Sequence, residues 1–256
     1  MSTPTSPIAT VDPNAGAAQP GLSEPARIIN TFAAPSKTFL DIRRNANWWT
    51  PWLLISIMAM AYWFTVDKKV GFEQIAQQFV ANSKQIQLQP PEQQAKTAAG
   101  VATFSKFSGY AAPVFTLVFG LLTAGILCVV FNFLMAAEIS FGRAFAIVIY
   151  GWFPASIVGS ILSIISVSFG NPEGFRVENP VATNPGYFMD PHTTSKFVMG
   201  ALSSFDVLGL WMAALVGMGF ALNSKKKLAT GTAIGTVVAL YFVAKLIGAA
   251  FAGLGS

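Results

Sequence analysis

Two long uncharged runs, residues 107–137 and 144–172, constrain this chain more than any other feature of its sequence. Each run is longer than the roughly 20 apolar residues that an α-helix needs to cross a bilayer core of about 30 Å. The short polar break between them, residues 138–143, has room only for a turn. The two runs therefore predict an antiparallel pair of transmembrane helices, and with it an integral membrane protein.

The composition agrees with a chain surrounded by lipid. Hydrophobic residues make up 53% of the sequence and charged residues 11%, whereas soluble domains average about 25% charged residues. The single cysteine, Cys128, excludes an internal disulfide and is typical of a small buried apolar residue. The net charge of +5 is too diffuse for a nucleic-acid surface, but it fits basic residues that flank membrane spans.

These patterns predict an all-α integral membrane protein, a five-transmembrane-helix bundle with an N-terminal amphipathic interfacial helix. Residues 1–22 have the composition of a disordered tail. Residues 23–47, the lead-in, form the amphipathic segment, and residues 48–252 form the membrane domain. The expected spans cover about residues 49–66, 111–137, 144–167, 203–222 and 230–252.

The lead-in carries a start signal for a helix, because Ser23 can cap it and Pro25 falls in its first turn. Its apolar residues recur with roughly helical spacing, and Pro35 must break or restart the helix. An apolar stripe with basic edges just before a span indicates a helix lying on anionic lipid. The alternative is an amphipathic helix packed on the loops of the bundle itself.

Aromatic and basic residues mark the start of the first span. Trp48, Trp49 and Trp52 match the aromatic belt found at membrane interfaces, and Arg43 and Arg44 precede them. We expect these five side chains to act as interfacial anchors.

The short loops favour a cytoplasmic N-terminus. The loops after the second and fourth spans carry Arg143 and residues 225–227, all basic, while both loops on the other side are long. Short loops rich in Lys and Arg stay inside. We therefore expect a multi-pass protein of the bacterial cytoplasmic (inner) membrane. The polar segments 67–106 and 168–200 are either ordered caps or partner-binding surfaces, and the sequence leaves that choice open.

Two charged residues interrupt the last two spans. Asp206 lies 20 residues before the centre of the turn at Lys226, and Lys245 lies 19 residues after it. Equal offsets in an antiparallel pair mean equal depth, so we expect a structural ion pair between Asp206 and Lys245. The alternative is that Lys245 extends alone toward the membrane surface and that Asp206 caps its own helix.

Other residues in the spans suggest how the helices pack. Pro154 predicts a helix kink, or on a functional interpretation a broken transporter helix. Asn132 predicts a hydrogen bond between helices, and Gly231 with Gly235 forms a small-residue pair.

Three short motifs resemble a known family. Residues 32–39 (FAAPSKTF) before residues 49–52 (WTPW) resemble the opening segment of the bacterial Yip family, multi-pass proteins named for eukaryotic Rab-GTPase-interacting membrane proteins. Residues 150–154 (YGWFP) look like its third-helix proline, and residues 205–211 (FDVLGLW) look like its Asp and Trp pattern at the fourth helix.

This resemblance covers about residues 26–250 and implies a five-span bundle. In eukaryotic relatives it implies vesicle trafficking and Rab binding. No matching cytosolic N-terminal motif occurs in this sequence, so Rab binding is not carried over. For bacterial-type members the resemblance implies no settled activity.

Two functional hypotheses follow. The first is a non-enzymatic scaffold that binds other membrane proteins or organises the bilayer. The second is a small-solute transporter or channel subunit that uses Pro154, Asp206 and Lys245. An intramembrane enzyme fits less well, because the spans hold one carboxylate, no histidine and no HExxH pair. We expect no cofactor, no metal and no nucleic-acid partner, and the oligomeric state stays open.

Overall fold

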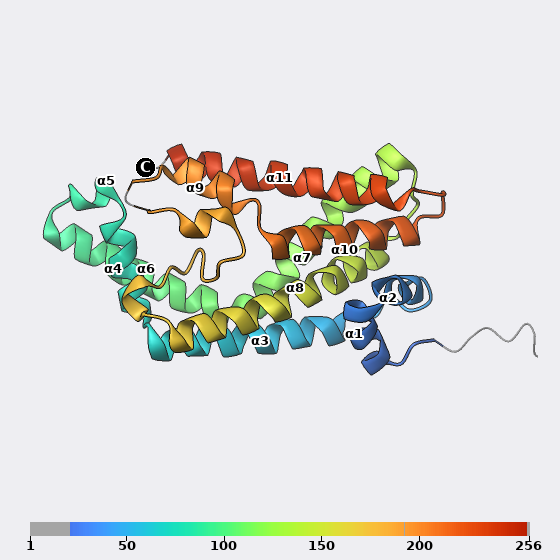
Figure 1. Cartoon of the computed structure of the whole chain (residues 1–256), viewed down its shortest axis with the longest axis horizontal. Helices are drawn as coiled ribbons and strands as arrows, with labels where there is room; N and C mark the ends of the chain where they lie inside the picture. The colour runs from blue at the N-terminus through green and yellow to red at the C-terminus, as the bar shows by residue number, and fades with distance from the viewer. Residues whose placement is uncertain (1–20, 192, 255–256) are drawn as a thin grey trace, which may run out of the picture.

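The computed structural model describes residues 21–191 and 193–254, and this part of the chain is helical, without a strand. Its long helices lie along one axis (Figure 1). They are α3 (Trp49–Lys69), α7 (Ala112–Val129), α8 (Phe141–Phe169), α10 (Val207–Asn223) and α11 (Thr230–Leu254). The expected tail falls almost wholly outside the described residues.

Four helical segments are long and apolar enough to cross a membrane: Trp49–Lys69, Ala112–Leu134, Phe141–Phe169 and Thr230–Gly253. A fifth crossing exists if α9 (Lys196–Ser203) and α10, which meet at an angle of 51°, count as one broken span. The multi-pass prediction is thus confirmed, with four to five candidate spans in the described part of the chain.

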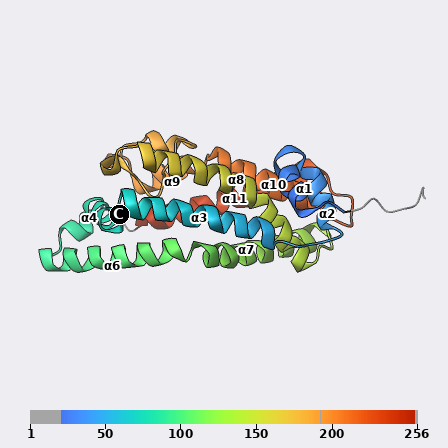
Figure 2. The same cartoon turned by 90° about the horizontal axis from the view of Figure 1, so that it is seen from below.

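The lead-in and the polar cap occupy opposite ends of the bundle. In both views α1 (Glu24–Ala33) and α2 (Pro35–Ile42) lie at one end, and α4 (Phe72–Ala81) lies at the other (Figures 1 and 2). The cap also contains α5 (Lys84–Gln87) and α6 (Pro91–Tyr110), which leads into α7. The Tyr110 hydroxyl ties the cap to α3 by donating to Asp67 Oδ2 over 2.8 Å, and this bond, with desolvation, raises the pKa of Tyr110.

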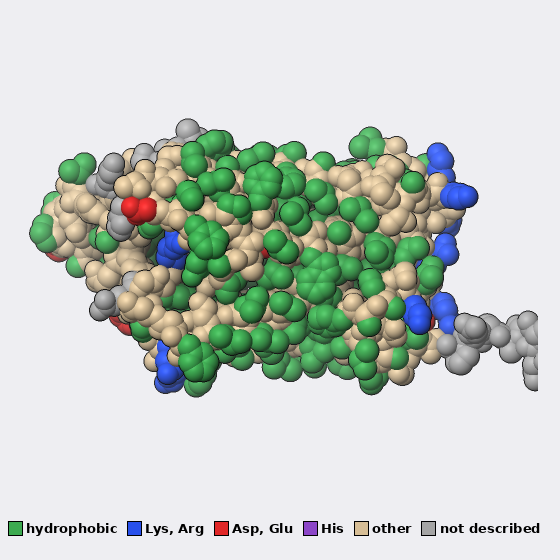
Figure 3. Space-filling view, in the orientation of Figure 1, with side chains coloured by type: hydrophobic (Ala, Val, Ile, Leu, Met, Phe, Trp, Pro, Cys, Tyr) green, Lys and Arg blue, Asp and Glu red, His purple; other side chains and the backbone are tan. Residues whose placement is uncertain are grey.

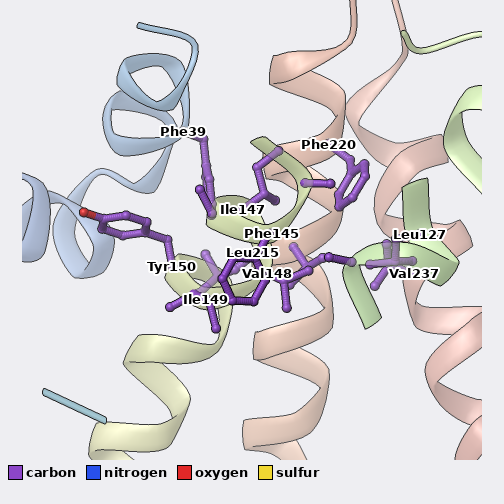
Figure 4. Close-up of a cluster of buried hydrophobic side chains, with 14 of the residues drawn as sticks. Phe39, Leu127, Phe145, Ile147, Val148, Ile149, Tyr150, Leu215, Phe220 and Val237 are labelled. Carbon is purple, nitrogen blue, oxygen red and sulfur yellow. The ribbon is translucent and has the colours of Figure 1, made fainter. Parts of the chain in front are cut away.

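Helix α8 is the centre of the bundle. In the most apolar stretch of α8, 56% of the residues are buried. The corresponding share is 22% in α3 and in Ala112–Leu134, and 11% in α11. Its residues 144–151 are all buried, so this part of the helix touches neighbours all round. Figure 4 shows side chains of α2, α7, α10 and α11 converging on this stretch.

Close helix approach, more than burial of apolar surface, holds such a bundle together, since lipid tails are as apolar as leucine. A Cβ added to Gly151 of α8 would lie 2.5 Å from Val216 Cγ2 of α10. A Cβ added to Gly217 would lie 2.5 Å from the Cα of Ile234 in α11. Glycine at these two positions lets α10 lie close to both neighbours.

Asn132 corrects one sequence-based expectation. Instead of bonding to another span, its amide Nδ2 donates to the Ile139 carbonyl (2.9 Å) and its Oδ1 accepts from the Ile139 N–H (2.8 Å). These bonds satisfy backbone groups of the loop that follows the π-helical turn Val130–Leu134. The reason is proximity: the loop turns back at once, with positive φ at Ala136 and Glu138, and brings Ile139 beside Asn132.

The close contact at Gly217 generates a prediction. Gly217→Val should lower the free energy of unfolding by about 1–3 kcal/mol or more, because the added Cβ meets backbone atoms that cannot move alone. Gly235→Val is the matched control in the partner helix, since a Cβ there meets nothing within 4 Å. Thermal unfolding in detergent measures both, and equal losses would contradict the close contact.

Candidate functional site

A buried arginine joins the lead-in to the bundle. Arg27 of α1 has no exposed surface, and its Nε lies 2.8 Å from Asp41 Oδ2. Its guanidinium also pairs with Glu24 at 3.4 Å, donates to the Asn45 carbonyl and lies 5.2 Å from the ring centre of Tyr150. We call Arg27, Glu24, Asp41 and Tyr150 the Arg27 cluster.

The Arg27 cluster connects α1 and α2 to the central helix. In Figure 4 the Tyr150 side chain extends from α8 toward the lead-in helices. A second tie comes from α10, where Asn223 Nδ2 donates to the Phe39 carbonyl over 2.8 Å. The start signal at Ser23 is confirmed, because its hydroxyl accepts from the Ala26 N–H. The lead-in thus packs on helices α8 and α10 rather than on the loops of the bundle, and its contact with anionic lipid stays a prediction.

The net charge of the protein is concentrated beside the lead-in. We call this the basic end; it comprises residues 24–44, the loop before α8 with the start of that helix, and the loop between α10 and α11. Figure 3 shows Lys and Arg side chains gathered there. Its surplus of five positive charges equals the formal net charge of the whole chain, +5. The charged residues are eight basic (Arg27, Lys37, Arg43, Arg44, Arg143, Lys225, Lys226, Lys227) and three acidic (Glu24, Asp41, Glu138).

The tryptophans expected at the interface differ in their surroundings. Trp49 is 51% exposed and lies at the surface. Trp48 instead packs edge-on against Phe145 at 4.9 Å, and Trp52 Nε1 donates to the Pro113 carbonyl over 3.1 Å. Trp48 and Trp52 therefore help join α3 to α8 and α7, while Arg43 and Arg44 are exposed beside them.

The helix break between α9 and α10 is built around Asp206. This residue is the N-cap of α10, and its Oδ1 accepts from the Gly209 N–H over 2.9 Å. Its Oδ2 accepts from the Thr183 hydroxyl (2.8 Å) and the Asn184 amide (3.4 Å). The loop before α9 thus returns to the break and supplies neutral donors to the carboxylate.

The structure does not bring Asp206 and Lys245 together. No ion pair within 4.0 Å joins them, although both belong to the described chain. Lys245 Nζ lies 5.7 Å from the ring centre of Tyr241, and the Tyr241 hydroxyl fills the space beside Gly209. Equal depth was therefore not sufficient, because Tyr241 stands between the α10 N-terminus and Lys245 and Asp206 has closer donors.

Pro154 lies inside helix α8, which continues on both sides of it, and its side chain is buried.

Gly231 and Gly235 of α11 face open space, so neither mediates a close contact within the described chain. The same part of the chain holds no group of three or more His, Cys, Asp and Glu side chains that could bind a metal.

Sequence reasoning missed the role of Arg27, which it treated as one of several basic residues at a lipid surface. A signal was present: Glu24 and Asp41 are the acidic residues of the lead-in, and Glu24 lies one helical turn before Arg27. Two carboxylates in an otherwise basic segment indicate an internal partner.

Comparison with known proteins gives a family. The family model described as the Yip1 domain matches residues 29–247, most of the chain. The comparisons with curated proteins and with solved structures found no match.

The Arg27 cluster yields a second prediction. Arg27→Met should lower the free energy of unfolding by about 3–5 kcal/mol, because it leaves the Asp41 carboxylate buried and unpaired. Arg27→Met with Asp41→Leu should recover part of that loss. Lys37→Gln, on the same segment but exposed, is the control and should change little. Thermal unfolding in detergent decides, and a wild-type value for Arg27→Met would contradict the role of the cluster.

Asp206 and Lys245 yield a third prediction, which concerns stability. Asp206→Ala should cost about 1 kcal/mol, since it removes the α10 cap, and Lys245→Met should cost little. The double variant should show the sum of the two losses within about 0.5 kcal/mol. A double variant clearly more stable than that sum would show that the two charges pair after all.

Proposed function

The chain belongs to the Yip1 domain family, and on that premise we propose that it is a non-enzymatic scaffold of the bacterial cytoplasmic membrane. In this role it binds other membrane proteins along its outer helices and organises them at the bilayer. Its N-terminus and basic end face the cytoplasm. The Yip1 family is not a known enzyme family, which agrees with this proposal.

The observation that carries the proposal is the exposed apolar surface of the peripheral helices. In the most apolar stretch of α11 only 11% of the residues are buried. In the most apolar stretch of Ala112–Leu134 the buried share is 22%. On α11 the exposed face includes Gly231 and Gly235, one helical turn apart, where a Cβ meets nothing within 4 Å. Membrane helices associate through small residues that let backbones approach, so this face suits another transmembrane helix.

The inner half of the bundle also supports a scaffold. Around residues 144–151 of α8 the described side chains form one continuous apolar cluster. Asp206, the carboxylate that a transporter would need, accepts bonds from Thr183, Asn184 and the Gly209 N–H. A buried apolar cluster and a carboxylate with three donors favour a centre that is closed to a polar solute.

The basic end suits a cytoplasmic membrane surface. Positive short loops favour the inside, and anionic lipids of the inner leaflet attract clustered Lys and Arg. We propose that Arg43, Arg44 and Trp49 contact this surface as interfacial anchors from a docked lead-in, with Trp48 and Trp52 holding the start of α3 in place.

A small-solute transporter or channel subunit is the second candidate. The observation in its favour is the 51° break between α9 and α10, with Asp206 at the break. Broken helices of this kind bind substrates and ions in transporters. Pro154 and Lys245 would then belong to the moving parts.

Site-specific photocrosslinking in native membranes tests the scaffold. A photoreactive residue at Ala239, on the exposed face of α11, should capture a protein partner. The same group at Ala233, a buried position on the same helix, should not. Crosslinks to lipid alone at Ala239 would contradict partner binding through this face.

A thiol-labelling control separates the two candidates. Val216→Cys places a thiol in the core of a chain that also carries Cys128→Ser. A scaffold with a closed core should protect this thiol from a water-soluble reagent. Rapid labelling would reveal a water path and favour the transporter.

A further inference from the structure

A cavity of about 250 Å³ opens at the end of the bundle opposite the basic end. It lies where α3 and α8 finish, between Val70, Val167 and the loop that follows α8. Its floor is the small apolar cluster that contains Val70, Val167 and Phe175. Its polar lining comes from Ser166, Asn171, Arg176, Asn179 and Tyr187.

Arg176 is the charged residue among the described lining residues. Its guanidinium is held in place, because Nη1 donates to the Met189 carbonyl (3.1 Å), Nη2 donates to the Tyr187 carbonyl, and the group lies 5.5 Å from the Tyr187 ring centre. Among the carboxylate side chains that the structure describes, none lies within 4.0 Å of this guanidinium.

A partly buried cation with no described carboxylate beside it is unusual, since buried charges are normally paired. In Arg176 the carbonyl contacts use two of the five N–H donors of a guanidinium, so three remain. The amide groups of Asn171 and Asn179 add polar lining on the loop side of the cavity. A fixed cation beside neutral polar groups is an arrangement that accepts an anion.

The position of the cavity selects the kind of anion. It lies at the ends of two membrane-spanning helices, and two strongly exposed aromatic residues, Phe169 (87%) and Phe188 (71%), belong to the same part of the chain. The ends of membrane-spanning helices lie at the headgroup level of a bilayer, where phosphate is the abundant anion. The planar guanidinium fork matches phosphate oxygens.

We propose that this cavity binds a phosphate group, either that of a phospholipid headgroup or that of a soluble phosphate ester, with Arg176 as its cationic contact. The site is independent of the partner-binding face on α11 and of the basic end.

Thermal unfolding of the full chain in a maltoside detergent tests the proposal at constant ionic strength. The two probes are glycerol 3-phosphate and a short-chain phosphatidylglycerol below its micelle concentration. A saturating ligand should raise the Tm by about 2–4 °C. A shift with the lipid alone assigns the site to a headgroup, and a shift with glycerol 3-phosphate assigns it to a soluble ester. No shift with either probe overturns the proposal.

Two variants locate the site. Arg176→Gln should weaken binding about tenfold or more, because it removes the charged donor. Gly174→Leu should also abolish the shift while leaving Arg176 in place, since Gly174 lines the cavity and a Cβ there meets nothing within 4 Å. If Arg176→Gln fails to fold, Gly174→Leu decides: a wild-type shift in that variant overturns the proposal.

Lys68→Gln is the matched control, because Lys68 is an exposed cation at the same end of the bundle, outside the cavity. It should bind both probes as the wild type does. An equal loss in Lys68→Gln and Arg176→Gln would mean that general surface charge attracts the probes, and this result would also overturn the proposal.

Discussion

The interior of a bilayer offers no hydrogen-bond partner, so a polar group in this bundle is costly unless the chain itself satisfies it. That constraint explains features that look unrelated at first. Asp206 caps α10 and accepts bonds from Thr183 and Asn184, and Asn132 completes the backbone of the loop that follows it. In each case a polar side chain is matched to nearby backbone or loop groups, which leaves the core around α8 apolar.

The same constraint shapes the two ends differently. At the basic end the ionic groups are concentrated, and the one buried cation, Arg27, has two carboxylates and an aromatic face. At the opposite end Arg176 is held by carbonyl oxygens and a ring, with no carboxylate of the described chain in reach. The difference between a paired and an unpaired cation is what separates a structural tie from a candidate binding site.

Hydropathy and charge alone predict the membrane class and the approximate position of the helices, because a span must be long and apolar whatever it packs against. Contacts between side chains are not accessible in the same way. The equal depth of Asp206 and Lys245 follows from counting residues, but the rotation of α11 that places Tyr241 between them depends on packing against Gly209. The burial of Arg27 likewise depends on a carboxylate 14 positions further along the chain and on a tyrosine of α8.

The docked lead-in has a consequence for how the protein is made. A ribosome releases α1 and α2 before any of the membrane helices, yet the groups that receive them belong to α8 and α10. The amide of Asn223 and the carbonyl of Phe39 are 184 residues apart. During synthesis Arg27 is therefore made before its partner Tyr150 exists. The lead-in emerges first but is among the last segments to reach its final position. Docking of the lead-in can therefore be completed only after α8 and α10 have been inserted.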